Sequence, residues 1–150
     1  MTSLEHPNKP TISWSYLIAA LVSLIGLGDA VYLTVQDMTG ASLRCTIISG
    51  CSEVLASKYS HIGSIPLASV GAAAYFAFFS LAILAAFGYR WARPLLTILV
   101  TVMFLMTLWL LYLQAFVIRH FCQYCLLSAA VTTVLAVVII GSRVVRRRAG

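Results

Sequence analysis

Residues 121–142 read FCQYCLLSAAVTTVLAVVIIGS and contain no Asp, Glu, Lys or Arg. A helix needs roughly 20 mostly apolar residues to cross the hydrocarbon core of a membrane, and this stretch meets that requirement. Residues 14–36, 66–88 and 95–118 meet it as well, with Asp29 as the one charge inside them. The sequence therefore predicts an all-α membrane protein, a bundle of four transmembrane helices.

The composition of the whole chain agrees with a membrane protein. Of the 150 residues, 61% are hydrophobic and 9% are charged, and the mean hydropathy is +0.98. A soluble domain of this length would need far more charge to cover its surface. We expect one integral-membrane domain over residues 1–150. The polar segment 1–13 contains Pro7 and Pro10, so we do not expect a cleaved signal peptide.

The basic residues divide unequally between the two sides of a four-helix bundle. Both termini and the connection at residues 88–94 share one side, and the positive-inside tendency places that side in the cytoplasm. The net charge of +6 then reflects topology and contact with anionic lipid headgroups rather than nucleic-acid binding. The basic side would carry Lys9, Arg90, Arg93, Arg143, Arg146, Arg147 and Arg148, and the other side Arg44, Lys58 and Arg119.

All four cysteines fall on the other side of the bundle. Cys45 and Cys51 lie in the long connection 37–65, and Cys122 and Cys125 open the fourth helix. We therefore expect them on the oxidising face, in a bacterial periplasm or the lumen of an endoplasmic reticulum.

The long connection between the first two helices is expected to contain a short helix. Residues 51–59 can form it over the mouth of the bundle, with Val54, Leu55 and Tyr59 on an apolar face. Farther along the connection, His61 is interpreted as a solvated loop residue.

The spacing of the cysteines suits thiol–disulfide exchange. Cys122-Gln-Tyr-Cys125 is a C-x-x-C pair, and a helix N-terminus stabilises a thiolate there. Cys45 and Cys51 form a second pair in a loop that can move relative to the bundle. Together they suit serial exchange, in which the loop pair meets a partner and the fixed pair meets an acceptor in the membrane.

Other uses of four cysteines remain open at this point. The same residues can hold a zinc ion, form two purely structural disulfides, or bind a soft metal at the mouth of a carrier. The main alternative from a different functional class is therefore a membrane protein that binds or transports metal ions through its cysteines.

The order and spacing of these motifs resemble the vitamin K epoxide reductase family. The resemblance runs over residues 20–140 and includes Ser57, six residues beyond Cys51. It implies a quinone-reducing disulfide oxidoreductase that oxidises a thioredoxin-like (DsbA-like) protein and supports disulfide-bond formation, with no metal expected.

The resemblance also implies a role for each matching residue. Cys45 would form the mixed disulfide with the partner, and Cys51 would attack the inner pair at Cys122. Cys125 would transfer electrons to the quinone, and Ser57 would orient or hydrogen-bond the quinone carbonyl.

Two departures from the animal enzymes separate this chain from epoxide reduction. An asparagine that holds the vitamin K ring is absent from residues 66–69, and a tyrosine of those enzymes corresponds to Ala129. The chain thus looks like a bacterial homologue in the inner membrane that reduces ubiquinone or menaquinone. Because it lacks the fused thioredoxin-like domain of many relatives, its partner should be a separate protein.

Three further residues are candidates for a quinone pocket. Asp29 lies about 10 Å of helix rise from the outer end of the first helix. It is interpreted as a proton-delivery or quinone-pocket residue, or as a protonated or water-linked group inside the bundle. Tyr75 and Tyr112 can line an apolar quinone cavity, although aromatic residues in membrane helices more often serve in packing.

Overall fold

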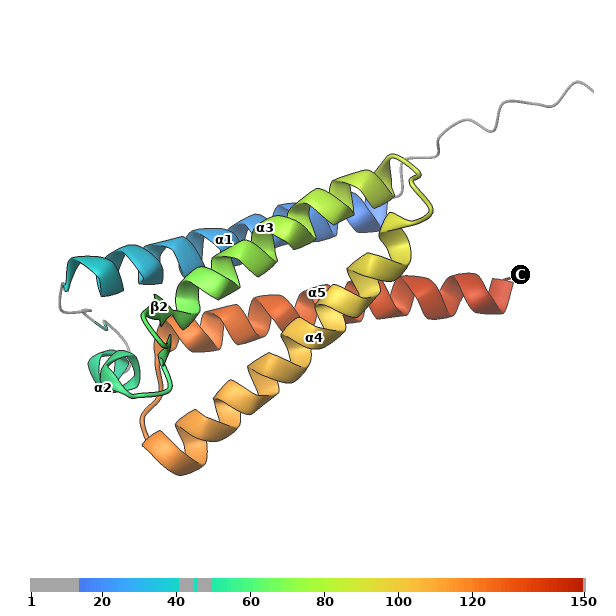
Figure 1. Cartoon of the computed structure of the whole chain (residues 1–150). Helices are drawn as coiled ribbons and strands as arrows, with labels where there is room; N and C mark the ends of the chain where they lie inside the picture. The colour runs from blue at the N-terminus through green and yellow to red at the C-terminus, as the bar shows by residue number, and fades with distance from the viewer. Residues whose placement is uncertain (1–13, 41–44, 46–49, 150) are drawn as a thin grey trace, which may run out of the picture.

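The computed structural model describes residues 14–40, 45 and 50–149, and its architecture is a bundle of four long helices (Figure 1). All four are long and apolar enough to cross a membrane, which confirms the predicted fold class. Segment 1–13, with Lys9 of the predicted basic side, and Arg44 of the other side lie outside the described residues. In chain order the long helices are α1 (Trp14–Thr39), α3 (Leu67–Ala86), α4 (Ala92–Tyr112) with its π-helical continuation η1 (Leu113–Ile118), and α5 (Gln123–Ala149).

The outer surface of the bundle is apolar. In the most apolar window of Ala92–Ile118, only 11% of the residues are buried inside the protein. Large side chains such as Leu21, Ile98 and Val137 are more than half exposed. Contiguous apolar surface of this extent is rare in soluble proteins and is the surface that lipid covers. The four helices mark the chain as an integral membrane protein.

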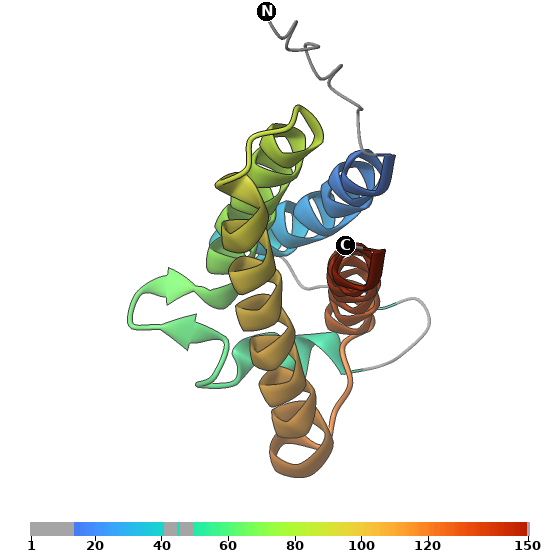
Figure 2. The same cartoon turned by 90° about the vertical axis from the view of Figure 1, so that its right-hand side faces the viewer.

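The helices form a ring in which each packs on two neighbours. α1 packs along α3 and α5, and α4 completes the ring by contacting both α3 and α5 (Figure 2). Small buried residues on α1 and α3, among them Ala20 and Ala82, permit close helix approach. Phe78, Leu96 and Leu135 fill the centre of the core.

One end of the ring is open, because α4 diverges from α5 toward the end that carries the short helix α2 (Cys51–Ala56) (Figure 1). The predicted helix at 95–118 ends where the structure ends it, but residues Leu113–Ile118 are π-helical rather than α-helical. The consecutive residues Leu113 and Gln114 are both buried in this wider turn. Single π-turns inside α-helices often occur at functional sites.

The helix in the long connection is shorter than predicted. α2 ends at Ala56, so the predicted helix at 51–59 was too long and Tyr59 lies beyond it. Ser57 has extended backbone angles there, and its hydroxyl donates a hydrogen bond to the carbonyl of Val54 over 2.7 Å.

A small hairpin that the sequence analysis did not predict follows. Strands β1 (His61–Ile62) and β2 (Ile65–Pro66) pair antiparallel, with Gly63 at a φ of 67° in the turn. His61 is not simply a solvated loop residue, because its Nε2 lies 2.9 Å from Oδ2 of Asp37 near the end of α1. This contact holds the hairpin against the bundle.

Close packing of α1 on α3 predicts an asymmetry between two neighbouring glycines. A Cβ at Gly26 would overlap the buried ring of Tyr75, whereas one at Gly28 would meet nothing within 4 Å. We expect Gly26→Ala to lower the free energy of unfolding by about 1–3 kcal/mol, since an overpacked core must shift. Gly28→Ala is the matched control and should not lower the free energy of unfolding. Denaturant unfolding in detergent measures both, and equal stabilities would contradict the packing.

Candidate active site

The outer cysteine pair is a disulfide that joins the loop to the start of α2. Cys45 and Cys51 are bonded, with their Cα atoms 6.1 Å apart. Cys51 is the first residue of α2 and is 1% exposed, whereas Cys45 is half-buried. A molecule approaching from solvent therefore reaches the sulfur of Cys45 more readily than that of Cys51.

Gly50, directly before α2, packs on the segment that precedes α5. Its φ of 148° is a conformation that residues with a side chain rarely adopt. A Cβ there would lie 2.9 Å from the carbonyl oxygen of Phe121 and 3.2 Å from Cβ of His120. The absence of a side chain at Gly50 thus lets Cys51 approach Cys122 closely.

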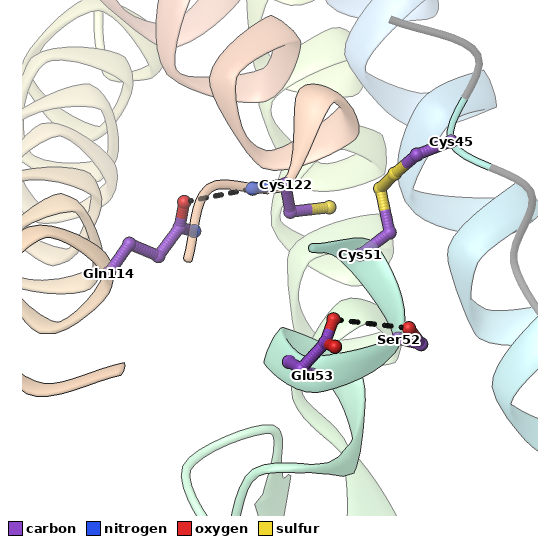
Figure 3. The surroundings of a disulfide bond; sticks show 6 residues. All are labelled: Cys45, Cys51, Ser52, Glu53, Gln114 and Cys122. Atoms are coloured by element: carbon purple, nitrogen blue, oxygen red, sulfur yellow. Dashed lines mark hydrogen bonds between the residues drawn. A yellow bond between two sulfur atoms is a disulfide. The ribbon is translucent and has the colours of Figure 1, made fainter. Parts of the chain in front are cut away.

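The inner cysteine pair consists of two free thiols at the start of α5. Cys122 is fully buried and immediately precedes the helix, and its carbonyl accepts a hydrogen bond from the N–H of Leu126. Its own N–H donates to Oε1 of Gln114 over 3.4 Å. Figure 3 shows the Cys122 sulfur pointing toward the Cys45–Cys51 disulfide.

The surroundings of Cys122 favour its thiolate. A hydrogen bond from the thiol of Cys125 lowers the pKa of Cys122 from 9.0 to about 7. Burial opposes this effect, and hydrogen bonds from the backbone of Cys125 and Tyr124 assist it. A thiol with a lowered pKa is both more ionised at neutral pH and a better leaving group in disulfide exchange.

All four cysteines belong to one apolar cluster. Cys51, Val54 and Cys122 form its buried centre, and Cys45, Leu55, Ile118, Tyr124 and Cys125 pack around them. The two pairs therefore meet in one cluster, at its buried residues Cys51 and Cys122.

An apolar cavity of about 160 Å³ lies at the open end of the bundle, where Cys125 forms part of its wall. Its wall includes residues of α1, α3, α5 and the α4–η1 segment. Residues of α2 and Ser57 cover it at the end of the bundle that carries the cysteines. Three other residues singled out from the sequence, Asp29, Ser57 and Tyr75, also line it. The structure therefore brings one thiol of the inner pair together with these three polar groups.

The polar groups in the cavity differ in how they are satisfied. The hydroxyl of Tyr75 lies within hydrogen-bonding distance of Oγ of Ser128 and Oγ1 of Thr132, at 2.8 Å in both cases. Asp29 is 9% exposed, and its Oδ2 has no hydrogen-bond partner among the described residues. A buried carboxyl oxygen without a partner is costly and indicates a group that a ligand or a water satisfies.

Tyr112 does not line this cavity. Its ring is 52% exposed on the outside of α4 and stacks near the rings of Trp109 and Phe116. On a helix whose residues are almost all apolar, hydropathy alone does not tell which face points inward.

Gln114 is a site residue that the sequence analysis missed. It is 3% exposed, lines the cavity, and contacts both the backbone of Cys122 and the thiol of Cys125. The available signal was a lone amide side chain inside the apolar stretch 95–118. A polar side chain at that depth normally faces protein rather than lipid.

The sequence matches the Vitamin K epoxide reductase family over residues 17–140, a range that contains all four cysteines. The chain belongs to this family. This vitamin K epoxide reductase family member is thus an oxidoreductase of the membrane whose chemistry involves cysteines and disulfides.

The cysteines of this family member can also be compared with the alternative function, binding or transport of metal ions. Within the described ranges no group of three or more His, Cys, Asp and Glu side chains can hold a metal ion. Cys45 and Cys51 share a disulfide, so two of the four thiolates that a zinc site would need are not available in this state.

The hydrogen bond between the inner thiols predicts a measurable titration. In the state with the outer disulfide formed, ultraviolet absorbance of the Cys122 thiolate should rise with a midpoint near a pKa of about 7. Cys125→Ala removes the main donor, so the midpoint should move upward toward 9.0. Ser52→Ala, at an exposed position on α2, is the control and should leave it unchanged. A midpoint that Cys125→Ala does not move would show that this hydrogen bond does not set the pKa.

Proposed function

We propose that this protein oxidises the dithiol of a separate thioredoxin-like protein and passes the electrons through its two cysteine pairs to a membrane quinone. One observation carries the proposal: Cys122 packs against the outer disulfide, while its partner Cys125 lines an apolar cavity among the helices. The site thus connects a solvent-accessible sulfur to a pocket of the kind that an apolar ring occupies.

The first step takes place at Cys45. A thiolate of the partner attacks the Cys45 sulfur, which breaks the Cys45–Cys51 bond and forms a mixed disulfide. The second thiol of the partner then releases Cys45. The partner leaves as a disulfide, and Cys45 and Cys51 hold its two electrons as thiols. Attack at Cys45 follows from the burial of Cys51, which is 1% exposed.

The second step transfers the electrons inward. The Cys51 thiolate attacks Cys122 of an oxidised inner pair and releases Cys125, and Cys45 then attacks Cys51 and releases Cys122. The lowered pKa of Cys122 favours this last step, since a more acidic thiol leaves faster. Its product has an outer disulfide and two inner thiols, as in the structure.

The last step returns the inner pair to a disulfide. Cys125 lines the cavity, where its sulfur can give two electrons to a quinone ring while it loses its proton and the Cys122–Cys125 bond forms. Two protons are taken up by the ring oxygens. Ser57 and Tyr75 have hydroxyl groups in the wall, and each would have to turn from its present hydrogen-bond partner, Val54 or Ser128, to donate to a ring oxygen.

We infer that Asp29 supplies one of the two protons. It lines the same cavity as Cys125, and its Oδ2 is buried without a partner in the described part of the chain. Carboxyl groups inside membrane helices frequently serve in proton relays.

The proposed setting follows from the charge asymmetry. The α3–α4 connection and the end of α5, which carry Arg90, Arg93, Arg143 and Arg147, lie at the end of the bundle opposite to α2 (Figure 1). With the basic end in the cytoplasm, the cysteines face the periplasm, where a thioredoxin-like partner requires reoxidation. We therefore propose a bacterial inner membrane.

Turnover with a reduced partner tests this function. Purified protein should consume one quinone for each dithiol of a reduced thioredoxin-like protein, followed by quinone absorbance. Cys125→Ala should oxidise only one partner dithiol per chain and then stop, because the outer disulfide is used once and cannot be renewed. Cys45→Ala should oxidise none.

Ser52→Ala serves as the control, since Ser52 is exposed on the same short helix as Cys51, and it should turn over as wild type does. Unimpaired turnover of Cys45→Ala would contradict the order of transfer. If the wild-type protein oxidises the partner repeatedly without reducing any quinone, quinone is not the electron acceptor.

A second prediction concerns Asp29. Asp29→Asn keeps the shape of the side chain but removes its acid, so quinone reduction should slow by about 10²-fold, as for loss of a general acid. Asp29→Glu should restore most of the rate. The single oxidation of a partner dithiol by the outer disulfide should stay unchanged in both variants. Equal quinone reduction by Asp29→Asn and wild type across pH would exclude the role.

A further inference from the structure

A second cavity, of about 300 Å³, lies at the end of the bundle away from the cysteines. Its wall comes from the start of α1, the α3–α4 connection with the first turn of α4, and the last turns of α5. Four guanidinium groups gather there from two of these three parts of the chain. The lining residues are Tyr16, Arg90, Arg93, Pro94, Arg143 and Arg147.

No carboxylate of the described ranges balances this positive charge. Asp29 lies within α1, Asp37 near the far end of that helix, and Glu53 in α2, and none of them lines the cavity. The Nε of Arg93 is buried and has no hydrogen-bond partner among the residues that the structure places. A buried guanidinium donor of this kind favours an anionic acceptor.

The depth of the cavity matches that of lipid headgroups. The exposed rings of Tyr89 and Trp91 contact each other in the α3–α4 connection, next to Arg90, and such aromatic residues typically lie at the membrane–water interface. Leu95, which follows Arg93 on α4, and Ile140, which precedes Arg143 on α5, lie on the membrane side of the arginines and expose apolar surface. An anion bound here would thus sit directly above surface that can contact acyl chains.

We propose that this cavity binds the phosphodiester headgroup of an anionic phospholipid. The planar fork of arginine matches phosphate oxygens with paired hydrogen bonds, and basic pockets between membrane helices bind such headgroups. Free phosphate shares this chemistry, but the exposed apolar residues beside the arginines favour the lipid.

Native mass spectrometry of the detergent-solubilised full chain tests the proposal with two lipids, phosphatidylglycerol and phosphatidylcholine. The wild-type protein should retain more phosphatidylglycerol than phosphatidylcholine. Arg93→Gln should weaken that retention by about tenfold, because it removes one charge-assisted contact. Arg93→Lys should fall between the two, since it keeps the charge but loses the fork. Arg148→Gln, exposed on α5 and outside the cavity wall, should bind as wild type does.

Three outcomes would overturn the lipid site. The first is equal retention of the two lipids by the wild-type protein, and the second is an equal loss of phosphatidylglycerol binding in Arg93→Gln and Arg148→Gln. The third is displacement of phosphatidylglycerol by inorganic phosphate at equal concentration, which would indicate a site for the free anion. Thermal unfolding in the same detergent controls for the fold. If Arg93→Gln unfolds early, the comparison rests on Arg143→Gln against Arg148→Gln. The test does not depend on the redox reaction.

Discussion

The packing of Gly50 against the carbonyl of Phe121 is the contact on which the cysteine site depends. It joins the start of α2 to the segment that opens α5, two parts of the chain separated by two membrane helices. A side chain at Gly50 would push these segments apart, since a Cβ there has 2.9 Å to the backbone of Phe121. The disulfide at Cys51 and the thiol of Cys122 then share one buried cluster as a direct consequence.

Because α4 diverges from α5, a cavity forms among the helices beside the cysteine cluster. Where α4 leaves α5, the π-turn buries both Leu113 and Gln114, and the apolar cavity forms between them and α1. Gln114 connects the two features, because its amide contacts the backbone of Cys122 and also lines the cavity. The same few residues therefore hold the inner cysteines in place and shape the pocket beside them.

Much of this arrangement could be predicted from sequence because membranes restrict the available folds. Four apolar stretches give four helices, and helix parity places both cysteine pairs at one end. The misses involve features that hydropathy does not encode. The contact between His61 and Asp37 depends on a hairpin, and the outward orientation of Tyr112 depends on the rotation of α4. The π-turn that buries Gln114 is likewise a result of tertiary packing.

Burial, rather than differences in chemistry among identical side chains, gives the proposed relay its order. Cys45 is half-buried at the surface, Cys51 and Cys122 are 1% and 0% exposed, and Cys125 faces a cavity inside the bundle. In the proposed relay, a soluble thiol would therefore meet Cys45 first, and an acceptor dissolved in lipid would meet Cys125 first. Each sulfur exchanges with the one beside it, so the two reactants never need to meet. The second step passes through a disulfide between Cys51 and Cys122. The low pKa of Cys122 makes its sulfur a good leaving group, so attack by Cys45 on Cys51 readily releases the inner pair.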